Sequence, residues 1–329
     1  GVLYPPSTIT DKSTNLAGVQ VIASCEDRSG NYHRILLSSD IGAGNDGRFF
    51  TVNSAGTVTA LGSEDTTRDY VEGQADVISY GDTSNTSEIY FTHNTGIGRI
   101  SDVGGANTIN YTFYTTNWSA SAPHPMLVYE NNNYIANKNV LLRMTAVAGT
   151  PSAILTLPSN QTIVALGIDP GSGKMLISIV DQINQSDTIP ASCRMGLYDG
   201  FSNKLSRDVP IEDIVTAIHN TANSVYVMYG QNLGTWTGSG ISFLRKLTLS
   251  HLNTVLCFKH KIANIDRILF IAEKTKILAF GEITKQSGSV FWYAFAEDGA
   301  NNLSHIFNMG SDGTSNARLG ICFPTTKFY

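Results

Sequence analysis

Apolar and polar positions alternate with a period of two through most of this chain. In residues 164–180, "VALGIDPGSGKMLISIV", apolar side chains fill every second position on both sides of an Asp-Pro-Gly-Ser-Gly turn. A pleated strand points successive side chains to opposite faces, so this alternation is typical of strands. Two such runs joined by a turn of this composition predict a β-hairpin.

The same pattern returns along the chain. Gly, Asn and Asp occupy the turns, where they accept positive φ angles, and β-branched and aromatic residues fill the runs between them. Segments of this kind are 47–61, 88–103, 126–147, 224–247 and 267–283. The repetition predicts an all-β protein.

Two segments are also similar to each other. In both 155–180 and 207–230 an apolar residue and a proline are followed by a short polar link, an Ile-Val strand, a polar turn and a second strand. The distance from Pro158 to Pro210 is about 50 residues, close to the length of a propeller blade. Further inner strands are predicted to begin near Val19, Ala75, His124, Val255 and Phe291.

These repeats predict a single closed β-propeller over residues 1–329, with about seven blades of roughly four antiparallel strands. We expect the N-terminal strand to pair with the C-terminal "TTKFY" in one shared blade, which closes the ring. A blade buries both faces against its neighbours, which accounts for continuous apolar runs such as "VFWYAFA" and "RILFIA". The motifs of WD40 and sialidase propellers are absent from the sequence.

One segment has a second interpretation. Ile211, Ile214, Val215 and Ile218 are spaced at i, i+3, i+4 and i+7, as on one face of an amphipathic helix. The similar segment 159–168 has no such spacing. A strand is therefore predicted here, with at most one helical turn before it.

Composition argues against several partners. The chain carries 22 Lys and Arg against 27 Asp and Glu, a net charge of −5, so no basic face is expected to bind nucleic acid. No apolar stretch approaches the length of about 18 residues needed for a membrane helix, and membrane insertion is not expected. The polar residues are mostly Asn, Ser, Thr and Gly, a composition common in secreted and viral-particle proteins.

Metals, disulfides and cofactors are not predicted. The seven histidines form no ligand-spaced motif, and the Asp- and Gly-rich loops 40–47 and 310–316 do not match a calcium loop. The cysteines are far apart and lie in apolar, strand-like runs, so they are predicted to be small buried side chains; they are Cys25, Cys193, Cys257 and Cys322.

The sequence GSGK at 171–174 resembles the end of a phosphate-binding loop. That loop requires G-x-x-x-x-G-K-[ST], but Ile168 stands at the first glycine position and Met175 follows Lys174. The segment is therefore predicted to be a turn between two strands, without a bound nucleotide.

No catalytic residue is assigned, and the chain is predicted not to be an enzyme. Glycosidases need two carboxylates at a defined separation. Asp76 and Asp169 are the main acids on the predicted inner strands, and neither has a partner that the sequence reveals; a Ser-His-Asp triad lacks its G-x-S-x-G elbow. Trp118, in a polar loop, is the one candidate ligand-binding residue, as an aromatic platform for a sugar, whereas Trp236 is predicted to be structural.

The order of strands and turns in 197–247, preceded by "HPMLVYENNNYIANKNVLLRMTAV" (124–147), resembles the repeats of β-propeller proteins of bacteriophage virions, especially tail and tail-associated ones. The resemblance is one of repeat style and implies a structural or interaction module of a virion, with an extracellular location. Its partners would be other virion proteins or a host surface receptor or glycan, and it can form homo-oligomers in the particle. The alternative is a secreted, lectin-like carbohydrate-binding propeller, with glycoside hydrolysis as a weaker variant.

Overall fold

Turn residues and alternating side chains divide the chain into 26 strands in the part that the computed structural model describes. That part begins at residue 19 and ends at 322, and side chains are described up to 247 and for Cys322. Within it, the structure does not describe 28–33, 41–43, 54, 82–87, 104–105, 182–191, 221–223, 248–254, 261–264, 274–275, 282–288, 295–304 and 312–316.

The strands form antiparallel sheets in which chain neighbours pair in order. The first sheet contains β1 (Val19–Cys25), β2 (Arg34–Asp40), β3 (Gly47–Val52) and β4 (Val58–Asp65). The second contains β5 (Val77–Tyr80), β6 (Glu88–His93), β7 (Gly96–Ser101) and β8 (Thr108–Tyr114). The third contains β9 (Met126–Tyr129), β10 (Asn132–Asn137), β11 (Val140–Met144) and β12 (Ser152–Thr156).

The remaining sheets continue the same order around the ring. The fourth contains β13 (Gln161–Asp169), β14 (Lys174–Asp181), β15 (Ser192–Tyr198) and β16 (Arg207–Ile211). The fifth contains β17 (Val215–Asn220), β18 (Val225–Tyr229), β19 (Asn232–Trp236) and β20 (Ile241–Lys246). The sixth contains β21 (Val255–His260), β22 (Ile265–Glu273), β23 (Lys276–Gly281) and β24 (Ser289–Ala294), and the last contains β25 (His305–Ser311) and β26 (Ala317–Cys322).

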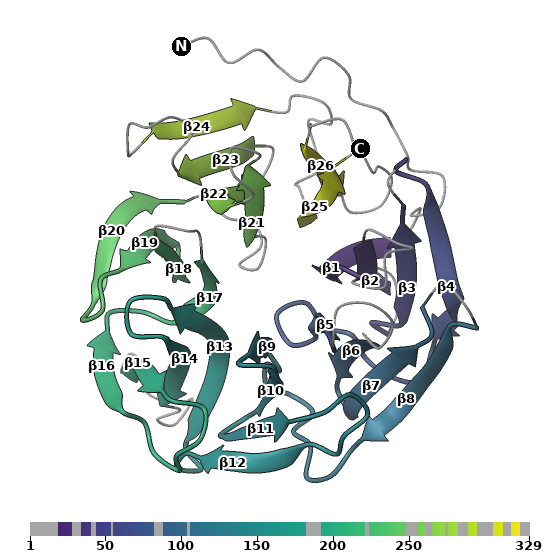
Figure 1. Cartoon of the computed structure of the whole chain (residues 1–329), viewed down its shortest axis with the longest axis horizontal. Coiled ribbons are helices and arrows are strands. Elements are labelled where there is room, and N and C mark those ends of the chain that lie inside the picture. Colours follow the sequence, from purple (N-terminus) through teal and green to yellow (C-terminus); the bar gives the residue numbers. More distant parts are fainter. Residues whose placement is uncertain are drawn as a thin grey trace.

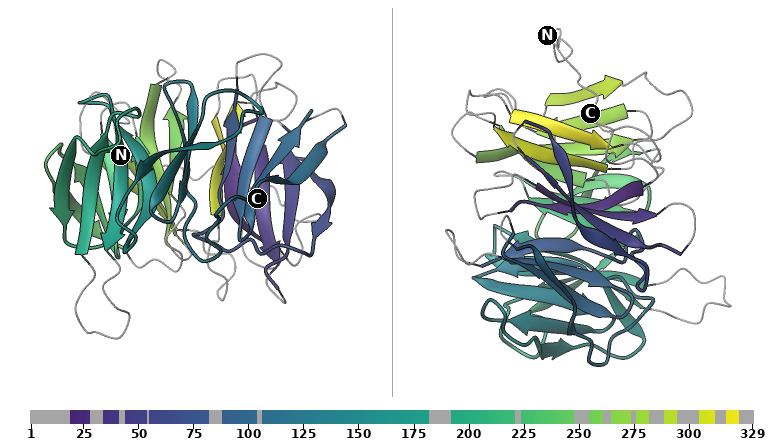
Figure 2. Two further views of the ribbon diagram at one scale, coloured as in Figure 1. Left: turned by 90° about the horizontal axis from the view of Figure 1, so that it is seen from below. Right: turned by 90° about the vertical axis from the view of Figure 1, so that its right-hand side faces the viewer.

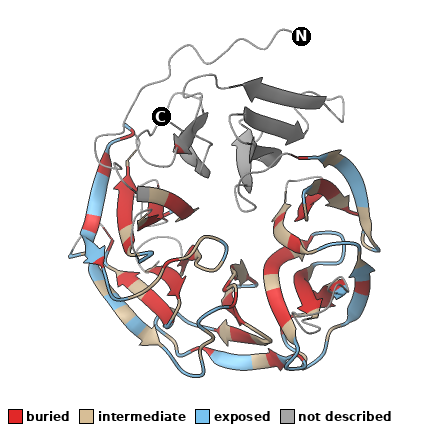
Figure 3. Ribbon diagram, turned by 180° about the vertical axis from the view of Figure 1, so that it is seen from behind, coloured by how far each residue is buried: buried red, intermediate tan, exposed pale blue. Residues whose placement is uncertain are grey.

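The sheets are arranged as the blades of a propeller around a central channel (Figure 1). The first strand of each sheet faces the channel, and each contacts the first strand of the next sheet, including β25 against β1. Seen from the side, the inner strands run along the axis of the ring (Figure 2). Among the strands with described side chains, the outer strands β4, β8, β12, β16 and β20 carry most of the exposed positions (Figure 3).

The all-β propeller is thus confirmed, but the blade count and the closure agree only in part. About seven blades were predicted, and five four-stranded blades are described together with side chains. A sixth four-stranded sheet and a two-stranded sheet are described mainly by their backbone. Among the described strands no hydrogen-bonded ladder joins the last sheet to the first. Blades meet through side chains, so a ring of sheets needs no such ladder. The predicted pairing of the N-terminal strand with "TTKFY" lies outside the described residues.

The core lies between the blades. One cluster joins the first and second sheets around Phe49, Tyr70 and Phe91, and similar clusters join each following pair up to the fifth sheet. The ring of Phe91 lies over Gly98, its partner in the β6–β7 ladder, where a Cβ atom would approach the ring to 2.0 Å. Cys322 of β26 packs with apolar residues of the first sheet, which places an apolar contact at the closing interface.

Most predicted elements are confirmed. The two similar segments each run from an outer strand into the first two strands of the next blade, as β12–β13–β14 and β16–β17–β18. The segment with helical spacing is not a helix. Ile211 ends β16, residues 212–214 form a bend, and Val215 and Ile218 lie in β17, which pairs with β18. The inner strand predicted near Phe291 is wrong. Phe291 lies in β24, the last strand of its sheet, and its apolar neighbours gave no signal to separate an outer strand from an inner one.

Candidate functional site

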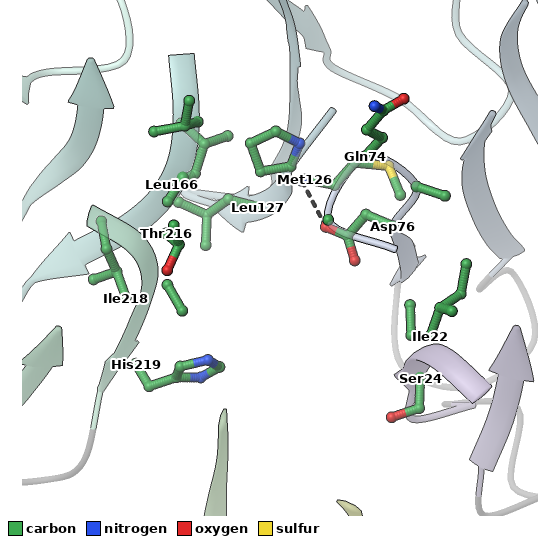
Figure 4. Close-up of a pocket in the computed structure, with 17 residues that line it drawn as sticks. Ile22, Ser24, Gln74, Asp76, Met126, Leu127, Leu166, Thr216, Ile218 and His219 are labelled. Atoms are coloured by element: carbon green, nitrogen blue, oxygen red, sulfur yellow. Dashed lines mark hydrogen bonds between the residues drawn. The ribbon is translucent and has the colours of Figure 1, made fainter. Parts of the chain in front are cut away.

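A cavity of about 350 Å³ lies at the centre of the ring. Its wall comes from five successive blades, from their inner strands or from residues just before them. The contributing segments are Ile22–Ser24, Gly73–Asp76, Pro125–Leu127, Val164–Leu166 and Thr216–His219 (Figure 4). Residues almost 200 positions apart in the sequence therefore share one site.

Irregular backbone surrounds this cavity. The ladders of β1, β13 and β17 each shift register by one residue, and the extra residues are Ile22, Val164 and Thr216. A β-bulge of this kind redirects a side chain and often occurs beside functional sites. All three extra residues lie in the cavity wall, so the same bulge shapes the wall in three blades.

Asp76 is the charged side chain of the described wall, and the backbone holds it in place. Its Oδ2 accepts a hydrogen bond from the Met126 N–H at 2.8 Å (Figure 4). Its Oδ1 accepts one from the Val77 N–H, also at 2.8 Å. The N–H of Asp76 in turn donates to Thr92 Oγ1 at 2.8 Å. Burial raises the pKa of Asp76 to about 6, and the two N–H donors oppose that rise. The carboxylate therefore links β5 to β9.

His219 approaches the cavity from β17, on the opposite wall (Figure 4). Desolvation lowers the pKa of its imidazole to about 4, so the ring is neutral at pH 7. Thr216, three residues earlier, has a buried hydroxyl without a hydrogen-bond partner among the described residues. Both groups can accept a hydrogen bond from a ligand.

The predicted ligand platform, Trp118, lies elsewhere. Its indole stacks on the ring of His124 with centroids 4.1 Å apart, and its Nε1–H donates to the His93 carbonyl at 2.8 Å. One face of the Trp118 indole thus packs against His124. A role of Trp118 in sugar binding stays a prediction. Trp236 is buried in the core between the fourth and fifth sheets, as predicted.

The GSGK segment is a two-strand turn, as predicted. Gly173, with φ +66°, donates its N–H to the Asp169 carbonyl at 2.8 Å, and Lys174 begins β14 opposite Asp169. The Asp169 carboxylate accepts hydrogen bonds from the Gly171 N–H and the Ser172 hydroxyl. Asp169, the second acid singled out in the sequence, therefore stabilises this turn and is not part of the cavity wall.

The described part of the chain contains no cluster of metal-binding side chains. No group of three or more His, Cys, Asp or Glu side chains is placed there to hold a metal ion. Cys25, Cys193 and Cys322 are not disulfide-bonded, and the last two are buried, whereas the side chain of Cys257 lies outside the described residues. The described residues also include no helix with the length and apolarity needed to cross a membrane.

Comparisons with known proteins agree on the fold. No family model matches the chain, and no curated protein matches it in sequence. Among solved structures it is similar to the extracellular domain of a protein described as a hybrid two component system from B. thetaiotaomicron, with 11% identity and a TM-score of 0.58. The match covers 97% of this chain and 39% of the other. At this identity the likeness shows a shared propeller fold.

Proposed function

We propose that this chain is a non-enzymatic interaction module that binds a partner at the central cavity and the adjoining propeller face. The observation that carries the proposal is the state of Asp76. It is the single carboxylate in the described cavity wall, and both of its oxygens already accept backbone N–H groups. Acid–base hydrolysis of a glycoside needs two carboxyl groups facing the scissile bond. A single, backbone-bonded carboxylate suits recognition.

The rigid frame around the cavity also supports binding. Five blades contribute to the wall, and each is a four-stranded sheet packed on its neighbours. A preformed wall lowers the entropy that a binding site loses when it captures a ligand. The repeat style of 124–247 supports a place in a phage virion, in a tail or surface appendage, with other virion proteins or a host surface receptor or glycan as the partner.

The purified protein is expected to bind without turnover. We would incubate it with panels of polysaccharides, esters and nucleotides and measure released reducing sugar, acid and phosphate, together with retention of each compound on immobilised protein. The proposal expects no release above a heat-denatured control. Product release that is lost in Asp76→Asn would contradict it, and retention of a glycan without turnover would favour the lectin-like alternative.

A further inference from the structure

The described cavity wall has an unusual balance of polar groups. Asp76 is its one ionised side chain at neutral pH, and no lysine or arginine is present in the wall segments. The other polar side chains are Ser24, Gln74, Thr216 and His219, each of which can accept a hydrogen bond. The described wall therefore repels anions and offers acceptors to a donor-rich cation.

Apolar side chains complete the same wall. Ile22, Leu166 and Ile218 are buried and line the cavity beside Leu127. They can cover the methylene groups of a short aliphatic chain, since apolar surface removed from water contributes about 25 cal/mol per Å². A ligand with one cationic end and one aliphatic stem matches both parts of the wall.

From these observations we infer that the central cavity binds an organic cation, an ammonium or guanidinium group on a short aliphatic stem. The cation lies against the Asp76 carboxylate, and the stem extends across the cavity along Leu127, Leu166 and Ile218 toward the opposite wall, where Thr216 and the neutral His219 carry no positive charge. This inference rests on the proposed function and specifies its ligand. The same chemistry can come from a free amine or from a lysine or arginine side chain of a protein partner.

Binding should depend on the charge of Asp76. Because burial brings the pKa of Asp76 to about 6, the carboxylate is mostly ionised at pH 7.5 and about nine-tenths protonated at pH 5. Among the described residues, the other titratable groups near it are His219 across the cavity, mostly neutral throughout this range, and the Cys25 thiol on β1, whose pKa burial raises. We expect affinity for the cation to fall about tenfold between pH 7.5 and pH 5.

The test is a calorimetric titration with n-butylammonium, using n-butanol and butyrate as matched probes. The proposal expects n-butylammonium to bind at least tenfold more tightly than either. A second arm titrates a lysine-containing peptide and the same peptide with norleucine in place of lysine. If the lysine peptide binds and the free amine does not, the cation site holds and a protein side chain is its source. Equal affinity for amine and alcohol, or no binding in either arm, would overturn the proposal.

Two variants locate the site. Asp76→Asn removes the charge but also disturbs a backbone link, so a second variant, His219→Lys, places a cation on the opposite wall without changing Asp76. It should weaken n-butylammonium binding at least tenfold, whereas Phe243→Lys, which places the same charge on the exposed outer strand β20, should bind within about twofold of the wild type. Unchanged binding by His219→Lys would contradict the site. If the ligands bind with affinities that do not depend on their charge and none is chemically converted, this inference is refuted while the proposed function stands.

Discussion

Phe91→Ala is expected to lower the free energy of unfolding by about 3–5 kcal/mol. Phe91 is fully buried between the first and second sheets, where its ring lies 4.5 Å from that of Phe49 and 5.9 Å from that of Tyr111, measured between centroids. Removing the ring leaves a cavity in the cluster that holds the two blades together. Urea unfolding followed by tryptophan fluorescence measures the loss.

Phe243→Ala is the matched control. Phe243 lies on the outer strand β20 with 58% of its surface exposed, so the same change in side chain should alter the free energy of unfolding by about 0.5 kcal/mol or less. Equal effects of the two substitutions would contradict the placement of the core between blades.

Acidification from pH 7 to pH 4 is expected to destabilise the protein by roughly 7 kcal/mol through its buried ionisable groups. Desolvation lowers the pKa values of His93, His124 and His219 to about 4, below the ordinary value near 6.5. The unfolded chain therefore binds protons that the folded one refuses in this window, and each histidine contributes about 3 kcal/mol of stability at pH 7 that is lost by pH 4. The raised pKa of Asp76 acts in the opposite sense, by about 2 kcal/mol.

Urea unfolding at several pH values in this range measures the effect. His124→Gln removes one of the three titrating rings. It should reduce the loss of unfolding free energy between pH 7 and pH 4 by about 3 kcal/mol, even though it also lowers stability at pH 7. The two ring nitrogens of His124 lie within 3.1 Å of the Ala136 and Ser119 carbonyl oxygens, which favour the protonated ring and so partly oppose the effect of desolvation on its pKa. An unchanged slope in that variant would assign the acid sensitivity to other groups.

Local sequence signals were sufficient for the blades. Turn residues located the hairpins, as in the Asn-Ser-Ala-Gly link between β3 and β4, because glycine and asparagine tolerate the backbone angles that such turns require. The position of each strand within its sheet, inner or outer, was harder to predict from the sequence. Phe291 was placed on an inner strand because inner and outer strands of this sheet carry similar apolar runs.

Little of the candidate site could be predicted from the sequence. Asp76 was singled out as an acid on an inner strand, but its bond to the Met126 N–H depends on a contact between two blades. His219 was not singled out because the seven histidines form no ligand-spaced motif in the sequence. The bulges at Ile22, Val164 and Thr216 have no sequence signature of their own, since they are defined by pairing register.

The proposed role as a binding component of a virion is tested most directly by locating the chain in its native source. Particles would be purified, imaged by electron microscopy with an antibody against this propeller, and their proteins quantified by mass spectrometry. The proposal predicts that the chain copurifies with particles at a fixed ratio to a major structural protein, with antibody on a tail or surface appendage. Recovery of the chain only in the particle-free, secreted fraction would contradict it.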